Sequence, residues 1–257
     1  MPKDKENATK EQKEKGLLKT LQAYWDLGQQ YYAKDFKKIK VLDATDRGDL
    51  WKAIGVKFPP YQILPDTNNV TYIKSNLLAS VYSVVKSASV LPTSEEDKDL
   101  CENLNVALDC LWDVMKVGLY QFQAGERAAL CNLGITQVGW DEDLVKGAGD
   151  SIVKGNVCFK NIDPLKFMRD PFATEFKYAG WCCTYDHYHK SILESNKNYK
   201  DAFKKYLEEN KDGDTTSTLQ VGPYNINPSN AKDYYTLICY WVRDGDKINE
   251  YHTLNNK

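Results

Sequence analysis

Several short motifs that mark common catalytic and nucleotide-binding sites are missing from this sequence of 257 residues. It has no GxSxG element for a nucleophilic serine, and none of its three histidines has an evident serine or cysteine partner in the local sequence. Neither GxxxxGKS/T nor GxGxxG, the glycine-rich loops that bind phosphate groups, is present. We therefore expect no enzyme activity and no cofactor.

A signal peptide, a long hydrophobic run and an excess of basic charge are also lacking. The first fifteen residues, MPKDKENATKEQKEK, have no apolar core, and no apolar run is long enough to cross a bilayer. The formal net charge is −2, so the chain has no overall basic field that would hold nucleic acid through its phosphates. We expect no membrane association and only weak contact with DNA.

The seven cysteines include no CxxC pair, and their number is odd, which favours reduced thiols in a cytosolic compartment. The stretch CCTYDHYH does bring Cys182, Cys183, His187 and His189 within eight residues. Zinc needs four converging ligands. Adjacent cysteines on a strand point to opposite faces, and the two histidines, expected on a helix, diverge. We therefore expect no metal site here.

The first half of the chain has helical periodicity. The charged residues 1–15 are predicted to form a frayed helix or a disordered arm. Apolar spacing predicts helices over 17–31 and 70–91, and Ser94 with the acidic residues behind it marks the start of a helix to about Gln123. Asp46 is expected to cap a short helix to Gly55. The two long helices should pack antiparallel, with a buried face on the second made of Leu100, Leu104, Leu108, Leu111, Trp112 and Met115.

After Gly125 the pattern changes to that of β-structure. Residues 133–162 predict a β-hairpin, and GWCCTYD predicts a third strand. Asp186 is expected to cap a helix to Glu194, and YKDAFKKYLEEN continues in helical register to 210. A polar loop is expected over 211–232. The final stretch YYTLICYWVRDGDKINEYHTL alternates on both sides of an Asp-Gly turn, which is typical of a hairpin.

The predicted fold class is therefore α+β, with long antiparallel helices first and then a mostly antiparallel β-sheet with inserted helices. We expect a charged flexible arm over 1–15, a helical part over 16–125 and a β-rich part over 126–257. No element after the last hairpin strand covers its edge, and an uncovered edge invites aggregation. We therefore expect this chain to be the front part of a longer gene product.

Two Asp-Pro pairs stand seven positions apart in NIDPLKFMRDPFATEFKYAGW, which spans residues 161–181. Proline forces the preceding residue out of helical geometry, and the Asp carboxylate can then accept the backbone N–H two residues on. Asp163-Pro164 is thus expected to end one strand, and Asp170-Pro171 to turn the chain again toward the next. On physical grounds these are structural turns.

An alternative is a metal-dependent nuclease. Asp163, Glu175 and Lys177 form a loose D…ExK pattern, in which two carboxylates hold Mg²⁺ and the lysine stabilises charge on the attacked phosphate. Such a site needs the Glu and the Lys on one rigid strand, and TEFKYAG has little strand character. The structural interpretation is favoured, but the alternative stays open.

The order of these motifs resembles that of tailed-phage portal proteins, the head-to-tail connectors. Their pattern has two strands, an I-D-P-x-x-F/Y-x-x-D-P turn, an A-x-W/Y strand, a helix and a later Y-W-x-R-D-G hairpin. The resemblance covers about residues 70–257. The residues that match the turn are Ile162, Asp163, Pro164, Phe167, Asp170 and Pro171, and those that match the later strands are Ala179, Trp181, Tyr240, Trp241 and Arg243.

The resemblance implies a wing-like part of a portal, a structural subunit of a dodecameric ring at one capsid vertex through which DNA is packaged and ejected. It implies a virion protein that is made in the host cytoplasm, with the major capsid protein, terminase, scaffold and a head-tail adaptor as partners. No long helix for the channel follows the hairpin. A phage ring adaptor is a further alternative. Because aromatic residues are enriched at interfaces, Trp181 and Trp241 are candidate subunit contacts, whereas Trp112 and Trp140 are assigned to the core.

Overall fold

The computed structural model describes residues 3–48, 67–82, 89–146, 153–209, 219–221, 224–226 and 233–255. The fold is α+β with antiparallel sheets, as predicted. The chain divides into two compact units, which we call unit 1 (Met1–Val41 with Leu165–Lys257) and unit 2 (Leu42–Pro164). The expected division near residue 125 is not where the chain divides, because the N-terminal helix packs on the C-terminal sheet and both belong to unit 1.

Helix α1 runs over Lys3–Asp46 and contains the whole segment 17–31 that the periodicity predicts. The charged residues from Lys3 onward are helical, so of the two forms expected for 1–15 the structure has the helix. No proline occurs between residues 3 and 58 to stop it. Gly48, with φ of 77°, ends it in the left-handed conformation. Asp46 is its last residue rather than the cap of a new helix, and residues 49–55 lie outside the described part.

Unit 1 contains a four-stranded antiparallel sheet in the order β3-β4-β7-β8. Its strands are β3 (Phe167–Arg169), β4 (Trp181–His189), β7 (Tyr234–Asp244) and β8 (Lys247–Leu254). The predicted final hairpin is confirmed: β7 and β8 pair from Asp244↔Lys247 onward, and Gly245 turns between them with φ of 60°. Strand β8 lies at the edge of this sheet, as expected.

The predicted helix start at Asp186 is wrong. Strand β4 continues through Asp186 to His189, because this stretch pairs residue by residue with β7. The His189 side chain then accepts a hydrogen bond from the Ser191 amide and caps α6 (Lys190–Ser195). A second helix, α7 (Lys200–Glu209), follows. Within the expected loop 211–232, short strands β5 (Leu219–Val221) and β6 (Tyr224–Ile226) pair with each other.

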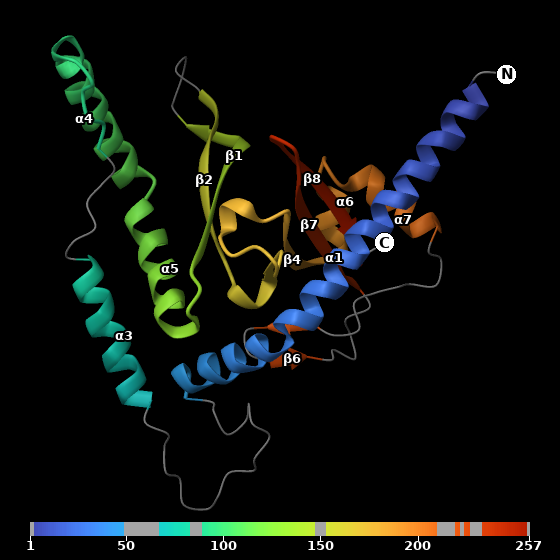
Figure 1. Ribbon diagram of the computed structural model, residues 1–257, viewed down its shortest axis with the longest axis horizontal. Helices are drawn as coiled ribbons and strands as arrows, with labels where there is room; N and C mark the ends of the chain where they lie inside the picture. The colour runs from blue at the N-terminus through green and yellow to red at the C-terminus, as the bar shows by residue number, and fades with distance from the viewer. Residues whose placement is uncertain are drawn as a thin grey trace, which may run out of the picture. The chain divides into compact units, whose positions relative to one another are not determined.

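Helices cover both faces of the sheet of unit 1 (Figure 1). This is possible because successive side chains of a strand point to opposite faces, and both sets contain apolar residues. On one face, Leu21 of α1 packs in a core with the residues Met168, Trp181, Cys183, Ile238 and Tyr240. On the other face, α6 and α7 pack in a core made of Leu193, Phe203, Tyr206, Tyr235, Leu237 and Leu254. This three-layer arrangement fixes both the Asp-Pro segment and the final hairpin.

Unit 2 holds helices α3 (Thr67–Tyr82), α4 (Lys98–Val114) and α5 (Val117–Cys131), the short 3₁₀ turn η1 (Glu95–Asp97), and strands β1 (Ile135–Lys146) and β2 (Val153–Ile162). The predicted hairpin over 133–162 is confirmed by the antiparallel β1–β2 pair. The helix predicted from Ser94 to Gln123 is broken at Lys116, which has φ of 53°. As a result α3 lies beside α5 and not beside α4 (Figure 1).

This break overturns the expected buried face of α4. Leu100, Leu104 and Leu111 are 60%, 42% and 49% exposed, and Leu108, Trp112 and Met115 are half-buried. Within α4, Cys101 is the buried residue. The amphipathic pattern of α4 is real, but among the described residues no helix lies along its apolar side.

A cluster of charged residues in unit 2 was not predicted. The buried carboxylate of Asp43 accepts hydrogen bonds from Arg127 at 2.7 Å and lies 3.1 Å from Nε of Arg47. Burial opposes ionisation of the Arg127 guanidinium, but the carboxylates of Asp43 and Asp163 outweigh it and raise the pKa of that group. Asp46 also pairs with Lys74 at 3.0 Å. These pairs tie the end of α1 to α3 and α5.

Candidate functional site

The second Asp-Pro pair closes a loop over residues 170–180. The Asp170 carboxylate accepts hydrogen bonds from the amides of Phe172 at 3.0 Å and Gly180 at 3.2 Å. Its own amide donates to the Trp181 carbonyl at 2.9 Å, and the amide of Arg243 donates to the Gly180 carbonyl at 2.9 Å. The expected bond to the amide two residues on is confirmed. The loop is thereby held to the start of β4 and to β7.

The first Asp-Pro pair lies where the chain passes from unit 2 to unit 1. Strand β2 ends at Ile162, and Pro164 begins a 3₁₀ turn that reaches Lys166. Pro164 is fully buried and closes unit 2, while Leu165 opens unit 1. The expected end of the strand at this pair is confirmed, and its position adds a role as the link between the two units.

Three aromatic side chains of the 170–180 loop are exposed, and the sequence interpretation did not single them out. Phe172 is 80%, Phe176 58% and Tyr178 63% exposed. Phe167 of β3 is buried beneath them, with its ring centroid 6.2 Å from that of Phe176. The sequence did offer a signal for this surface, namely three aromatic residues within seven positions of a segment that has neither helical nor strand periodicity. Exposed aromatic side chains on one loop are typical of a protein contact surface.

Two of the residues of the nuclease alternative contact each other instead of facing a common site. Glu175 and Lys177 form an ion pair of 2.8 Å, and both side chains are about three-fifths exposed. They flank and occupy the 3₁₀ turn η4 (Phe176–Tyr178), so they do not lie on a rigid strand. Asp163 belongs to unit 2. Among the described residues, no three Asp, Glu, His or Cys side chains are grouped so as to hold a metal ion.

The cysteines and histidines of CCTYDHYH all lie on strand β4, where alternation places Cys183, His187 and His189 on one face. The expected divergence of the two histidines on a helix is therefore wrong. Burial raises the pKa of Cys182 to about 11 and raises that of Cys183 further. His187 contacts the Thr236 hydroxyl at 3.0 Å, and His189 caps α6. Each group thus has a structural use.

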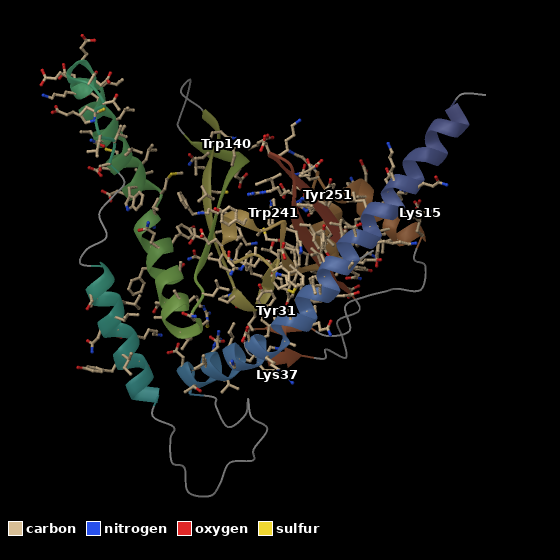
Figure 2. The ribbon with its side chains drawn as sticks, in the orientation of Figure 1. Lys15, Tyr31, Lys37, Trp140, Trp241 and Tyr251 are labelled. Carbon is tan, nitrogen blue, oxygen red and sulfur yellow. The ribbon has the colours of Figure 1, made fainter. Side chains whose placement is uncertain are left out.

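The tryptophans are placed differently from the expectation. The Trp181 ring is 4% exposed and stacks on Tyr24 of α1 at a centroid distance of 5.1 Å, so it is used inside unit 1 and not at a surface. Trp241 is half-buried on β7. Trp140, assigned to the core, is 62% exposed on β1 and covers Gly155 of β2 (Figure 2). Gly155 has φ of 84° and lies so close to this indole that a Cβ atom there would be 2.6 Å from it.

No protein-family model matches this chain, and no curated protein matches it. Helices long and apolar enough to cross a bilayer do not occur in the part of the chain that the structure describes.

Proposed function

We propose that this chain is a structural subunit of a tailed-phage portal ring. The observation that carries the proposal is the double Asp-Pro segment, in which Asp163, Pro164, Phe167, Asp170 and Pro171 match the portal turn position by position. Within this segment Pro164 is buried, and Asp170 closes a loop with its carboxylate.

The order of the elements supports the same proposal. A hairpin (β1–β2) precedes the double turn, a strand and a helix (β4 and α6) follow it, and a second hairpin (β7–β8) carries the Tyr-Trp-Val-Arg-Asp-Gly sequence. This is the order that the resemblance implies for the wing part of a portal. With a net charge of −2, such a subunit would let DNA slide, because few phosphate contacts would hold the polymer.

In a ring, the exposed aromatic side chains Phe172, Phe176 and Tyr178 would contact the neighbouring subunit. Aromatic residues are enriched where subunits meet, and the loop that carries these three is fixed at both ends by Asp170. The capsid, terminase, scaffold and adaptor contacts that portals make are part of the proposal only through the resemblance.

The test is negative-stain electron microscopy of the purified chain. Rings with a central hole are the expected result. Replacing Phe172 and Tyr178 together by serine should lower the proportion of rings, whereas Leu91→Ser, at a side chain that is 79% exposed in unit 2, should not. Dispersed monomers would contradict the portal proposal, and a Mg²⁺-dependent DNA cleavage assay with Glu175→Ala would then test the nuclease alternative.

A further inference from the structure

A cysteine, a histidine and a glutamate are joined in a row on the final hairpin. Cys239 of β7 lies directly opposite His252 of β8, with its Sγ atom 3.1 Å from Nδ1 of the imidazole. The other ring nitrogen, Nε2, lies 3.1 Å from a carboxylate oxygen of Glu250. All three side chains are on the sheet face that carries the core of α6 and α7, because Cys239 lies two residues from Leu237 on β7 and therefore points to the same face.

The hairpin fixes this row. Glu250 and His252 are two residues apart on one strand and therefore point to the same face. The direct pairing of Cys239 with His252 is set by the register that the Gly245 turn imposes. The hydroxyl of Tyr199 lies 3.3 Å from the same Nδ1, and its ring packs on the imidazole at a centroid distance of 5.5 Å.

The contacts on the two ring nitrogens indicate which of them carries the proton. With Glu250 accepting a hydrogen bond from Nε2–H, the lone pair of Nδ1 faces the Cys239 thiol at 3.1 Å and the Tyr199 hydroxyl at 3.3 Å. The thiol proton can move to Nδ1, which leaves a thiolate beside an imidazolium that the Glu250 carboxylate stabilises. Burial, with the nearby charges of Cys239, Tyr188 and Glu250, raises the pKa of Tyr199 to about 12, so its hydroxyl stays neutral.

Other cysteines of the chain lie in different surroundings. Cys183 is fully buried, and burial raises the pKa of Cys182 and of Cys131 to about 11, which makes these thiols poor nucleophiles at neutral pH. Cys110 on α4 is exposed and serves as a comparison. Cys239 combines partial exposure with an imidazole base at hydrogen-bond distance.

We propose that Cys239 is a reactive thiol and a modification site for small-molecule disulfides, with His252 as its base and Glu250 as the residue that positions the imidazole. The Cys239 thiolate attacks one sulfur of the disulfide, so that a new S–S bond forms and the old one breaks. The departing thiolate takes the proton that Nδ1 of His252 received. One protein thiol becomes a mixed disulfide and one small thiol is released: the Cys239 sulfur is oxidised, the departing sulfur is reduced, and the number of disulfide bonds is unchanged. This site is independent of the portal proposal.

The experiment uses the whole chain, with glutathione disulfide as the probe. Mass spectrometry of the peptides follows the mixed disulfide at Cys239 and at Cys110 in the same sample, so the ratio of the two rates cancels differences in reagent and protein. His252→Gln should lower this ratio about threefold at pH 7, because the gain in thiolate is partly offset by the lower nucleophilicity of a less basic thiolate. Glu250→Gln should lower it by a smaller factor.

A second readout follows the thiolate directly. The ultraviolet absorbance of wild type at pH 7 should exceed that of Cys239→Ser by the contribution of one partly ionised thiolate, and this difference should disappear when both proteins carry His252→Gln. An unchanged Cys239-to-Cys110 ratio in both variants would overturn the proposal, as would a wild-type Cys239 that stays unmodified while Cys110 reacts. If circular dichroism shows that His252→Gln does not fold, the Glu250→Gln variant serves as the test instead. Because the Glu250 side chain is half exposed, we expect this substitution to leave the fold intact.

Discussion

The carboxylate of Asp170 reaches ten residues along the chain to accept a hydrogen bond from the Gly180 amide at 3.2 Å. The same carboxylate accepts the amide of Phe172, and so one side chain satisfies two backbone donors at the two ends of the 170–180 loop. A Cβ atom at Gly180 would lie 3.2 Å from this carboxylate, so glycine suits the close approach. The second Asp-Pro pair is therefore a loop closure as well as a turn.

Replacing Asp170 by alanine should destabilise unit 1 by about 1–3 kcal/mol, because two backbone N–H groups lose their acceptor. Asp170→Asn keeps one acceptor oxygen and should cost less. Urea unfolding measures the difference, with the midpoint compared at equal slope. Glu175→Ala, which removes an exposed ion pair in the same loop, is the control and should change stability by less than about 0.5 kcal/mol. Equal losses for Asp170→Ala and this control would refute the closing role.

Two glycines of helix α1 give a matched pair. A Cβ atom at Gly28 would lie 2.9 Å from Sδ of Met168 and 3.2 Å from the Trp181 ring, whereas one at Gly16 would have no atom within 4 Å. Gly16→Ala should stabilise the protein by up to about 1 kcal/mol through helix propensity. Gly28→Ala should destabilise it by about 1–2 kcal/mol, since overpacking outweighs that gain. Thermal unfolding of both variants checks the prediction, which fails if both move the melting temperature in the same direction.

The sequence was a good guide wherever local chemistry decides structure. Alternation with a glycine turn between Asp244 and Asp246 was enough to predict the final hairpin, and the Asp170-Pro171 pair was enough to predict a turn with its carboxylate bond. Both depend on residues close in the chain. The continuation of β4 to His189 was missed, because its pairing with β7 overrides weak local signals. The length of α1 was also underestimated.

The misassigned face of α4 has another physical cause: amphipathic periodicity does not say what covers the apolar side. The break at Lys116 gave no signal, since a lysine in the left-handed conformation is unusual, and it moved α4 away from α3. The prediction of subunit contacts failed for a similar reason. Trp181 stacks on Tyr24 inside unit 1. The exposed aromatic residues Phe172 and Tyr178 lie in a loop whose composition does not distinguish it from other loops.

Two aspartates of helix α1 differ sharply in their surroundings. Asp43 is 3% exposed and pairs with Arg127 and Arg47, whereas Asp35 is an exposed partner of Lys38 at 3.7 Å. Asp43→Ala removes a buried carboxylate from two partly exposed arginines and should cost about 1–3 kcal/mol in unit 2. Asp35→Ala should cost less than about 0.5 kcal/mol. Chemical unfolding followed by circular dichroism separates the two, and similar costs would show that the Asp43 cluster contributes little.

The stability of unit 1 should depend on pH through His187. Burial lowers the pKa of this imidazole from 6.5, and the positive charge of Lys166 lowers it further, whereas the negative charge of Asp186 opposes the shift. The unfolded chain therefore takes up a proton at His187 at a pH where the folded protein does not. Stability is unaffected by this group above pH 6.5, and it falls as the pH drops from there toward the lower folded pKa, by at most about 1.4 kcal/mol per pH unit.

Urea unfolding of wild type and His187→Gln between pH 5 and pH 7.5 tests this sign. Because the other titrating groups are common to both proteins, the difference between the two curves isolates His187. Wild type should lose more stability than the variant below pH 6.5, and the two should run parallel above it. Lys166→Gln should shrink the difference, since it removes the second cause of the shift. Parallel curves over the whole range would mean that the imidazole is as easily protonated in the fold as in the unfolded chain.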